Sequence, residues 1–274
     1  FRGGVGKRYF VDAKLHFFVD GGVVKAELTA YDHEASTGMV TCDTELPVDT
    51  IGRWAFDEAV LGVHDGLLYA PGMDDLAGVA AGLSTLERTR KDPALGHVGL
   101  LLTRAEEVGF GGAIGACKSG TIPDDARLIV LETSRAFPSW PIGDGPVVRV
   151  GDRISIFDPD LTAAISRVAD ALDRPTQRKL MDGGACEATA FYLYGYTASS
   201  ICLPLGNYHN QGNLDAVEDG PGEAVPSPEF ISLDDHEGLI ELLVEVAKGI
   251  DVEGPDLRDR LERRFEGLTH LFDR

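Results

Sequence analysis

The chain has 274 residues, of which 43% are hydrophobic and 26% are charged, as in ordinary globular proteins, so a wholly disordered chain is excluded. Asp and Glu number 45 against 25 Lys and Arg, which gives a net charge of −20. Such a surface repels phosphate backbones and anionic lipid, so we expect neither nucleic acid nor a membrane as partner. The four cysteines are scattered without a CxxC pair, which favours a reducing cytoplasm.

The first 62 residues contain short β-rich runs, broken at Asp20-Gly21-Gly22 by a sequence typical of a hairpin. From about residue 63, strands and helices alternate, which predicts an α/β fold with a mixed, mostly parallel sheet flanked by helices. The predicted helices cover 75–90, 111–120, 158–174, 185–196, 232–250 and 256–270. The predicted strands cover 97–103, 126–133, 176–184 and 198–206, with a strand pair over 145–157.

Acidic side chains or an imidazole follow four successive apolar runs. They are Asp74 and Asp75, Glu106 and Glu107, Glu132, and His209. In open α/β sheets the chemistry lies at the carboxyl ends of strands, so we expect these groups to converge. Several carboxylates in one crevice need compensating positive charge, which a divalent metal ion supplies. Asp, Glu and His together suit Zn²⁺ or Co²⁺, with Mn²⁺ as a further alternative.

Most of these groups also have a simpler interpretation. Asp74 and Asp75 fit a helix N-cap, and Glu106 and Glu107 fit a solvated loop. His209 fits a hydrogen-bonded loop histidine. The charge of Glu132 after a buried strand is harder to dismiss, because burying a carboxylate is costly.

The segments that carry these groups are GMDDLAGVAAGL, TRAEEVGFGGAIGA, VLET, GPVVRVGDR, MDGGACEATAF and ICLPLGNYHNQG. In order and approximate spacing they resemble the co-catalytic zinc exopeptidases, and most closely the tetrahedral or glutamyl aminopeptidase family. The segment DGLLYAPGMDD also resembles the related zinc carboxypeptidase and deacylase branch, which stays an alternative.

The resemblance implies a metal-dependent hydrolase that removes N-terminal residues from short peptides through a metal-activated water. Asp74 would bridge two divalent ions, zinc in this family's pattern, with cobalt or manganese as alternatives. Glu107 and Glu132 would each bind one ion and His209 would complete one site. Glu106 would be the general base, and Asp75 would support the site or cap its helix.

The resemblance also implies a domain division and an assembly. Residues 1–62 would form a β-rich lid domain, and 63–274 would form the metallopeptidase catalytic domain. A homo-oligomer is expected on the same ground.

Three features depart from the family pattern. No His-x-Asp ligand motif stands upstream of Asp74, so we expect that the chain as given lacks the N-terminal part of the catalytic domain; the alternative is that His33 or His64 replaces that ligand. Cys186-Glu187 stands where the family tends to have Thr-Asp, and Asn-Gln follows His209 in place of Ser.

Two other functions therefore stay open. A deacylase or carboxypeptidase would need a basic side chain for a substrate carboxylate, for which Arg149, Arg153 and Arg178 are candidates. A non-catalytic scaffold with an incomplete metal site is the third possibility, which the presence of Glu106 as a base disfavours.

Overall fold

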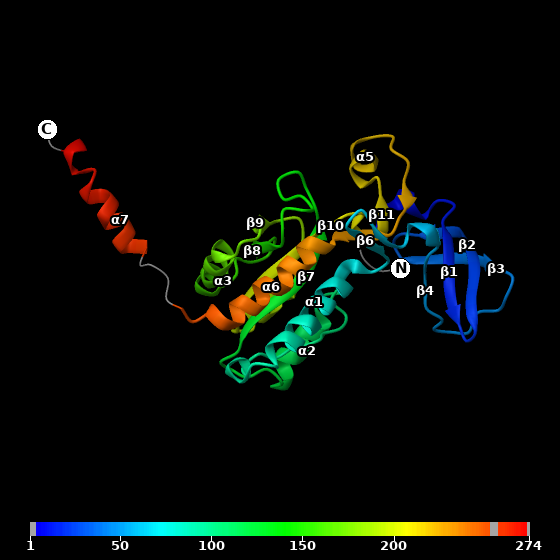
Figure 1. Cartoon of the computed structure of the whole chain (residues 1–274). Coiled ribbons are helices and arrows are strands. Elements are labelled where there is room, and N and C mark those ends of the chain that lie inside the picture. Colours follow the sequence, from blue (N-terminus) through cyan, green and yellow to red (C-terminus); the bar gives the residue numbers. More distant parts are fainter. Residues whose placement is uncertain (1–3, 253–256, 273–274) are drawn as a thin grey trace.

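The computed structural model describes residues 4–252 and 257–272 and contains several sheets and helices (Figure 1). Near the N-terminus, a short 3-10 helix, Lys7–Phe10, precedes an antiparallel sheet of order β3-β2-β1-β4. Its strands are β1 (Lys14–Val19), β2 (Gly22–Asp32), β3 (Thr37–Cys42) and β4 (Gly52–Trp54). Val19 pairs with Gly22, which confirms the predicted hairpin turn at Asp20-Gly21.

A second antiparallel sheet has the order β13-β6-β5. It consists of β5 (Gly62–His64), β6 (Leu67–Ala70) and β13 (Glu229–Ser232). Before β13 in the sequence, β11 (Gln211–Gly212) and β12 (Val225–Pro226) form a small antiparallel ribbon, and α5 (Leu214–Asp219) connects them. Figure 1 shows β6 and β11 between the N-terminal sheet and the long helices.

The central sheet has the order β7-β10-β8-β9. Its strands are β7 (Arg127–Arg135), β8 (Val147–Asp152), β9 (Gln177–Met181) and β10 (Thr197–Leu205). Within it, β7 with β10 and β8 with β9 are parallel, whereas β8 and β10 are antiparallel, so the sheet is mixed.

Six further helices accompany the strands in the described residues. They are α1 (Met73–Thr89), α2 (Gly111–Ser119), α3 (Pro159–Ala171), α4 (Glu187–Leu193), α6 (Leu233–Gly249) and α7 (Leu257–Glu266). Short 3-10 helices occupy Glu58–Val60, Pro93–Leu95, Tyr208–Asn210 and Thr269–Leu271. None of the described helices combines the length and the hydropathy needed to cross a bilayer.

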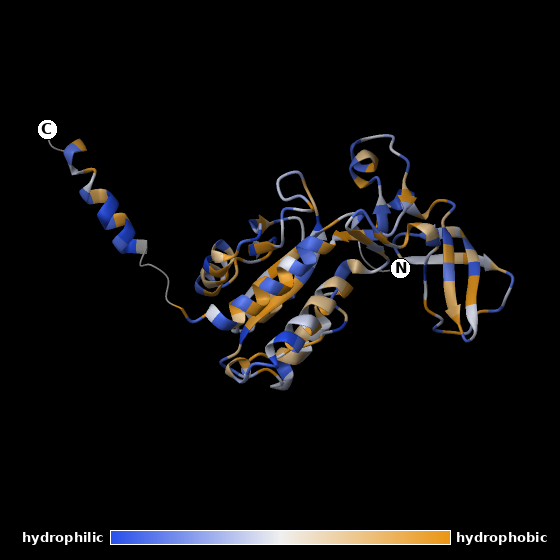
Figure 2. Cartoon of the chain, in the orientation of Figure 1, coloured by the Kyte–Doolittle hydropathy of each residue, from blue (hydrophilic) through white to orange (hydrophobic). Residues whose placement is uncertain are grey.

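The main core lies where β10 meets helices α1, α3 and α6. Ile201 and Leu203 of β10 are fully buried with Ile165 of α3 and Leu239 and Leu242 of α6. Figure 2 shows the central strands as mostly hydrophobic ribbon behind helices that alternate hydrophobic and hydrophilic residues, as expected for strands covered by amphipathic helices. The N-terminal sheet has a separate apolar cluster, which includes Leu15, Leu28 and Trp54.

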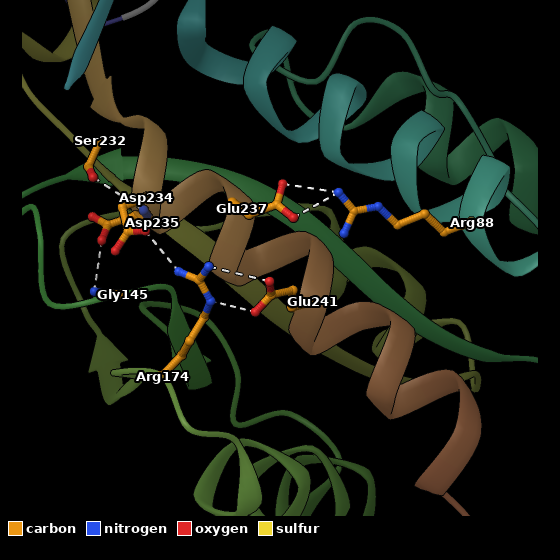
Figure 3. A network of polar contacts seen from close by, with 8 residues as sticks. All are labelled: Arg88, Gly145, Arg174, Ser232, Asp234, Asp235, Glu237 and Glu241. Carbon is orange, nitrogen blue, oxygen red and sulfur yellow. Dashed lines mark hydrogen bonds and ion pairs between the residues drawn. The ribbon is translucent and has the colours of Figure 1, made fainter.

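The start of α6 is fixed by polar contacts (Figure 3). The hydroxyl of Ser232 accepts the backbone N–H of Asp235 at 3.2 Å, which caps the helix. The buried carboxylate of Asp235 accepts the backbone N–H of Gly145 at 2.9 Å. Arg88 of α1 pairs with Glu237 of α6 at 2.8 Å, so the two helices are joined on their exposed side.

Two sequence predictions are wrong in detail. Residues 97–103 form no strand, and Leu101 and Leu102 are 40% and 56% exposed. An apolar run becomes a strand only where a neighbour offers backbone hydrogen bonds, and β7 pairs only with β10 among the described strands. In the predicted strand pair over 145–157, only β8 is a strand, and a single bridge joins Gly151 to Ile156.

Candidate metal centre

Asp74 and Asp75 lie at the start of α1, directly after β6. Asp74 has an extended backbone (φ −85°, ψ 102°), and the peptide bond between the two residues is cis. Oδ1 of Asp75 accepts the backbone N–H of Gly78 at 3.1 Å, so Asp75 caps the regular part of the helix. Asp74 follows β6, the strand that ends at Ala70, as predicted, and β6 belongs to the β13-β6-β5 sheet rather than to the central sheet.

Glu106 and Glu107 lie in the tight loop that precedes α2. The carbonyl of Glu106 accepts the backbone N–H groups of Gly109 and Phe110, both at 3.0 Å, which closes the turn. The side chain of Glu106 is half-buried and that of Glu107 is exposed. The loop therefore presents two adjacent carboxylates of different solvent access.

Glu132 and His209 are positioned by the neighbouring parallel strands β7 and β10. Glu132 lies inside β7, paired with Cys202, and is only 9% exposed; it falls within the predicted strand 126–133, and β7 continues two residues further, to Arg135. His209 lies in the turn just beyond β10 and has a left-handed backbone (φ 56°). The ring of Tyr208 stacks on the imidazole of His209, with 3.8 Å between the centroids.

The side chains from these separate elements meet at one place. Ligand atoms of Asp74, Glu107 and His209 all lie within 4.8 Å of one another, and so do those of Asp74, Asp75 and Glu132. Asp74 belongs to both groups. Oδ2 of Asp74 lies 3.8 Å from Nε2 of His209, too far for a hydrogen bond between them.

Burial and mutual repulsion raise the pKa values of these carboxyl groups. Burial, followed by the charge of Glu107, raises the pKa of Asp74 to about 6. The same two causes raise the pKa of Glu106 to about 7. The pKa of Glu132 is raised well above its usual value by burial and then by Asp74. Without further positive charge, the ionised cluster is therefore unfavourable.

The residues present fit a divalent cation. Two zinc ligands at about 2.0–2.1 Å from a tetrahedral ion lie roughly 3.3 Å apart, near the 3.8 Å between Asp74 and His209. Burial lowers the pKa of His209, which favours the neutral imidazole that a metal requires. Arg149 lowers the pKa values of Asp74, Glu106 and Glu132, but one guanidinium cannot balance them all.

The two alternative histidine ligands lie elsewhere. The ring of His33 contacts those of Tyr31 and Phe10, with centroids 4.5 and 5.4 Å away, in the N-terminal sheet. The ring of His64 lies 5.8 Å from that of Tyr69. Neither histidine belongs to a group of potential metal ligands within residues 4–252 and 257–272.

The three arginines considered for a substrate carboxylate differ in their surroundings. Arg149 is 3% exposed and lies within the fold near Glu132, so it compensates buried charge rather than facing solvent. Arg153 and Arg178 are exposed.

The sequence reasoning missed Glu229. Its carboxylate is 2% exposed and accepts the backbone N–H of Asp74 at 3.2 Å. It stands in the segment PSPEF, which has neither a metal-ligand spacing nor a helical period. Only the pairing of β13 with β6 brings it beside Asp74.

Comparisons with known proteins show the family of this chain. A family model described as M42 glutamyl aminopeptidase matches residues 43–219, more than half of the chain. That match includes Asp74, Glu106, Glu107, Glu132 and His209.

Solved structures share the fold. A TET aminopeptidase from the marine sediment archaeon Thaumarchaeota archaeon SCGC AB-539-E09 is 19% identical, with a TM-score of 0.68 over 91% of this chain and 74% of that one. Aminopeptidase APDkam598 from Desulfurococcus kamchatkensis is 18% identical, with a TM-score of 0.67 over 93% and 75%. The Pyrococcus horikoshii TET1 peptidase is 18% identical, with a TM-score of 0.67 over 89% and 74%. The chain belongs to the M42 glutamyl aminopeptidase family, a family of metallo-aminopeptidases.

Proposed function

We propose that this chain hydrolyses the N-terminal residues of short peptides with the help of two divalent metal ions. Asp74 would bridge the ions, Glu107 and Glu132 would each bind one, and His209 would complete one site. The observation that carries the proposal is that Asp74 belongs to both groups of converging ligand atoms. Zn²⁺ suits this oxygen and nitrogen set, with Co²⁺ or Mn²⁺ as alternatives.

When bound, such ions polarise a carbonyl and lower the pKa of water. Glu106 would take the proton from the attacking water and pass it to the leaving amine. Its pKa of about 7, raised by burial and by Glu107, suits a group that must both accept and release a proton near neutral pH. The carboxylate of Glu106 is also partly accessible, whereas Glu132 is nearly buried.

The remaining parts of the proposal rest on likeness to relatives. The Pyrococcus horikoshii TET1 peptidase can assemble into a tetrahedron or an octahedral shell, which supports a homo-oligomer here. We include residues 1–62 as a lid domain because the N-terminal sheet has its own apolar cluster, and 63–274 as the catalytic domain. A cytoplasmic location is supported by the four cysteines, none of which forms a disulfide.

The central test is Glu106→Gln. The substitution removes the base but none of the proposed ligands, so we expect kcat to fall by about 10²–10⁴-fold while metal content stays unchanged. The measurements are hydrolysis of aminoacyl chromogenic substrates and metal analysis of the same preparation.

Glu87→Gln is a matched control, since Glu87 is an exposed carboxylate on α1 with ion-pair distances of 3.7 and 3.8 Å. It should leave both values at the wild-type level. Full activity of Glu106→Gln would show that the assigned base is wrong.

A second test separates ligands from the base. His209→Ala and Glu132→Ala remove proposed ligands, so each should lose bound metal as well as activity. Elemental analysis should give about two ions per wild-type chain and fewer in the variants. An absence of both metal and hydrolysis in the wild-type chain would favour a non-catalytic scaffold.

A further inference from the structure

Glu229 is a buried carboxylate that the roles proposed above leave unused. It is the first residue of β13, pairs with Ala70 of β6 and is 2% exposed. Burial raises its pKa to about 7. A buried carboxylate opposes folding unless hydrogen-bond donors surround it, so its donors indicate what it does.

Those donors belong to backbone beside two of the proposed metal ligands. The N–H of Asp74 donates to Oε2 of Glu229 at 3.2 Å. The backbone N–H groups of Met73 and Asn210 also lower the pKa of this carboxyl group, because they stabilise its charged form. Met73 precedes Asp74, and Asn210 follows His209, so one carboxylate reaches two segments that are distant in the sequence.

The strand that carries Glu229 is itself fixed to the segment before His209. Gly206 and Phe230 exchange backbone hydrogen bonds of 2.9 and 3.2 Å. The side-chain amide of Asn207 donates to the carbonyl of Pro228 at 2.8 Å. Glu229 therefore lies on a well-connected strand, a condition for holding other groups in place.

We propose that Glu229 is a positioning residue of the metal centre, which holds the backbone at Asp74 and Asn210 so that Asp74 and His209 face the same ion. This inference rests on the proposed function, since it assigns Glu229 a part in the same site. A carboxylate offers two acceptor oxygens to these donors, whereas a glutamine offers one and turns an NH₂ toward them. Glu229→Gln is thus similar in size but deficient as an acceptor.

The test is a Zn²⁺ titration of the full chain after removal of metal, in competition with a chromophoric chelator. We expect Glu229→Gln to bind Zn²⁺ about 10–100-fold more weakly than the wild type, as is usual when a group that orients metal ligands is lost. Asp235→Asn is the matched control, because Asp235 is also buried and also accepts backbone N–H groups, at Gly143 and Gly145. It should lower stability and leave Zn²⁺ affinity unchanged.

The outcomes are distinguishable. If the folded Glu229→Gln variant binds Zn²⁺ as tightly as the wild type, or if Asp235→Asn weakens binding equally, the positioning role is wrong and the proposed function stands. If the wild-type chain takes up no Zn²⁺, Co²⁺ or Mn²⁺, both proposals fail.

If Glu229→Gln does not fold, amide hydrogen exchange of the wild-type protein tests the positioning role of Glu229 instead. Adding Zn²⁺ should then protect residues 227–231 together with 73–75 and 207–211, and an unchanged exchange rate over 227–231 would overturn the inference.

Discussion

At the scale of single residues, the candidate site is a cluster of carboxyl groups whose pKa values are raised by burial and by their mutual repulsion. Asp74 and Glu106 have pKa values of about 6 and 7, and each is raised first by burial and then by Glu107. In an unfolded chain these groups would ionise at ordinary values. The folded metal-free protein therefore binds more protons than the unfolded chain at mildly acidic pH.

This difference predicts the pH dependence of the metal-free protein. A carboxyl group whose pKa is raised by folding contributes stability below its unfolded pKa, and that contribution is lost as the pH rises through the folded pKa. With a chelator present, we expect the thermal unfolding midpoint to fall as the pH rises from about 5 to about 8, the window set by folded values near 6 and 7. Circular dichroism melting curves at several pH values measure this.

The neutral variant Glu106→Gln should show a smaller fall over the same window, because one of the responsible groups is absent. Saturating Zn²⁺ should also reduce the fall, since bound cations stabilise the ionised carboxylates. A midpoint that is constant or rises with pH in chelator would contradict this account.

At the scale of elements, the helices were easier to predict than the strands. The apolar period over 75–90 corresponds to α1, and the Asp158-Pro159 start corresponds to α3 with its Asp158 cap. The strand predicted over 97–103 is absent from the structure. A helix forms its backbone hydrogen bonds within itself, whereas a strand needs a neighbouring strand to form them. The C-terminal prediction over 256–270 corresponds to α7 and the turn at Thr269–Leu271 as far as residues from 257 are described.

The start of α1 gives a prediction at this scale. A Cβ atom on Gly78 would lie 2.6 Å from Oδ1 and 2.8 Å from Cγ of Asp75, so Gly78→Ala must displace the capping carboxylate. We expect the free energy of unfolding to fall by about 1–3 kcal/mol, as for other overpacked sites. Denaturant unfolding of the metal-free protein measures the change.

Gly115→Ala in α2 is the control, because a Cβ there meets nothing within 4 Å. Replacing an exposed helical glycine should raise the free energy of unfolding by about 0.5–1 kcal/mol. If both variants shift stability in the same direction, the close approach at Gly78 is not what limits α1.

At the scale of the whole molecule, the net charge of −20 acts on the compact state. Acidic side chains repel one another across the surface, and this repulsion opposes folding until salt screens it. Several acidic side chains also meet in the candidate site, where Arg149 is a buried cation that lowers several carboxyl pKa values.

Salt should therefore stabilise this protein. Raising NaCl from about 0.01 M to about 1 M shortens the screening length from roughly 30 Å to roughly 3 Å, so the thermal unfolding midpoint at pH 7 should rise. At a pH near the pI of about 4.6 the same titration should have a much smaller effect, because the net charge is then small. An equal effect at both pH values would assign the stabilisation to something other than charge repulsion.

The sequence by itself determined the alternation of strands and helices and the order of the acidic segments, because both depend on residues close together in the chain. It also supported the family resemblance that the match over residues 43–219 confirms. The tertiary structure alone decided that Asp74 follows a strand of a separate sheet and that Glu229 reaches the backbone at Asp74. The physical reason is that strand pairing and burial depend on partners distant in the sequence, which no local pattern of residues encodes.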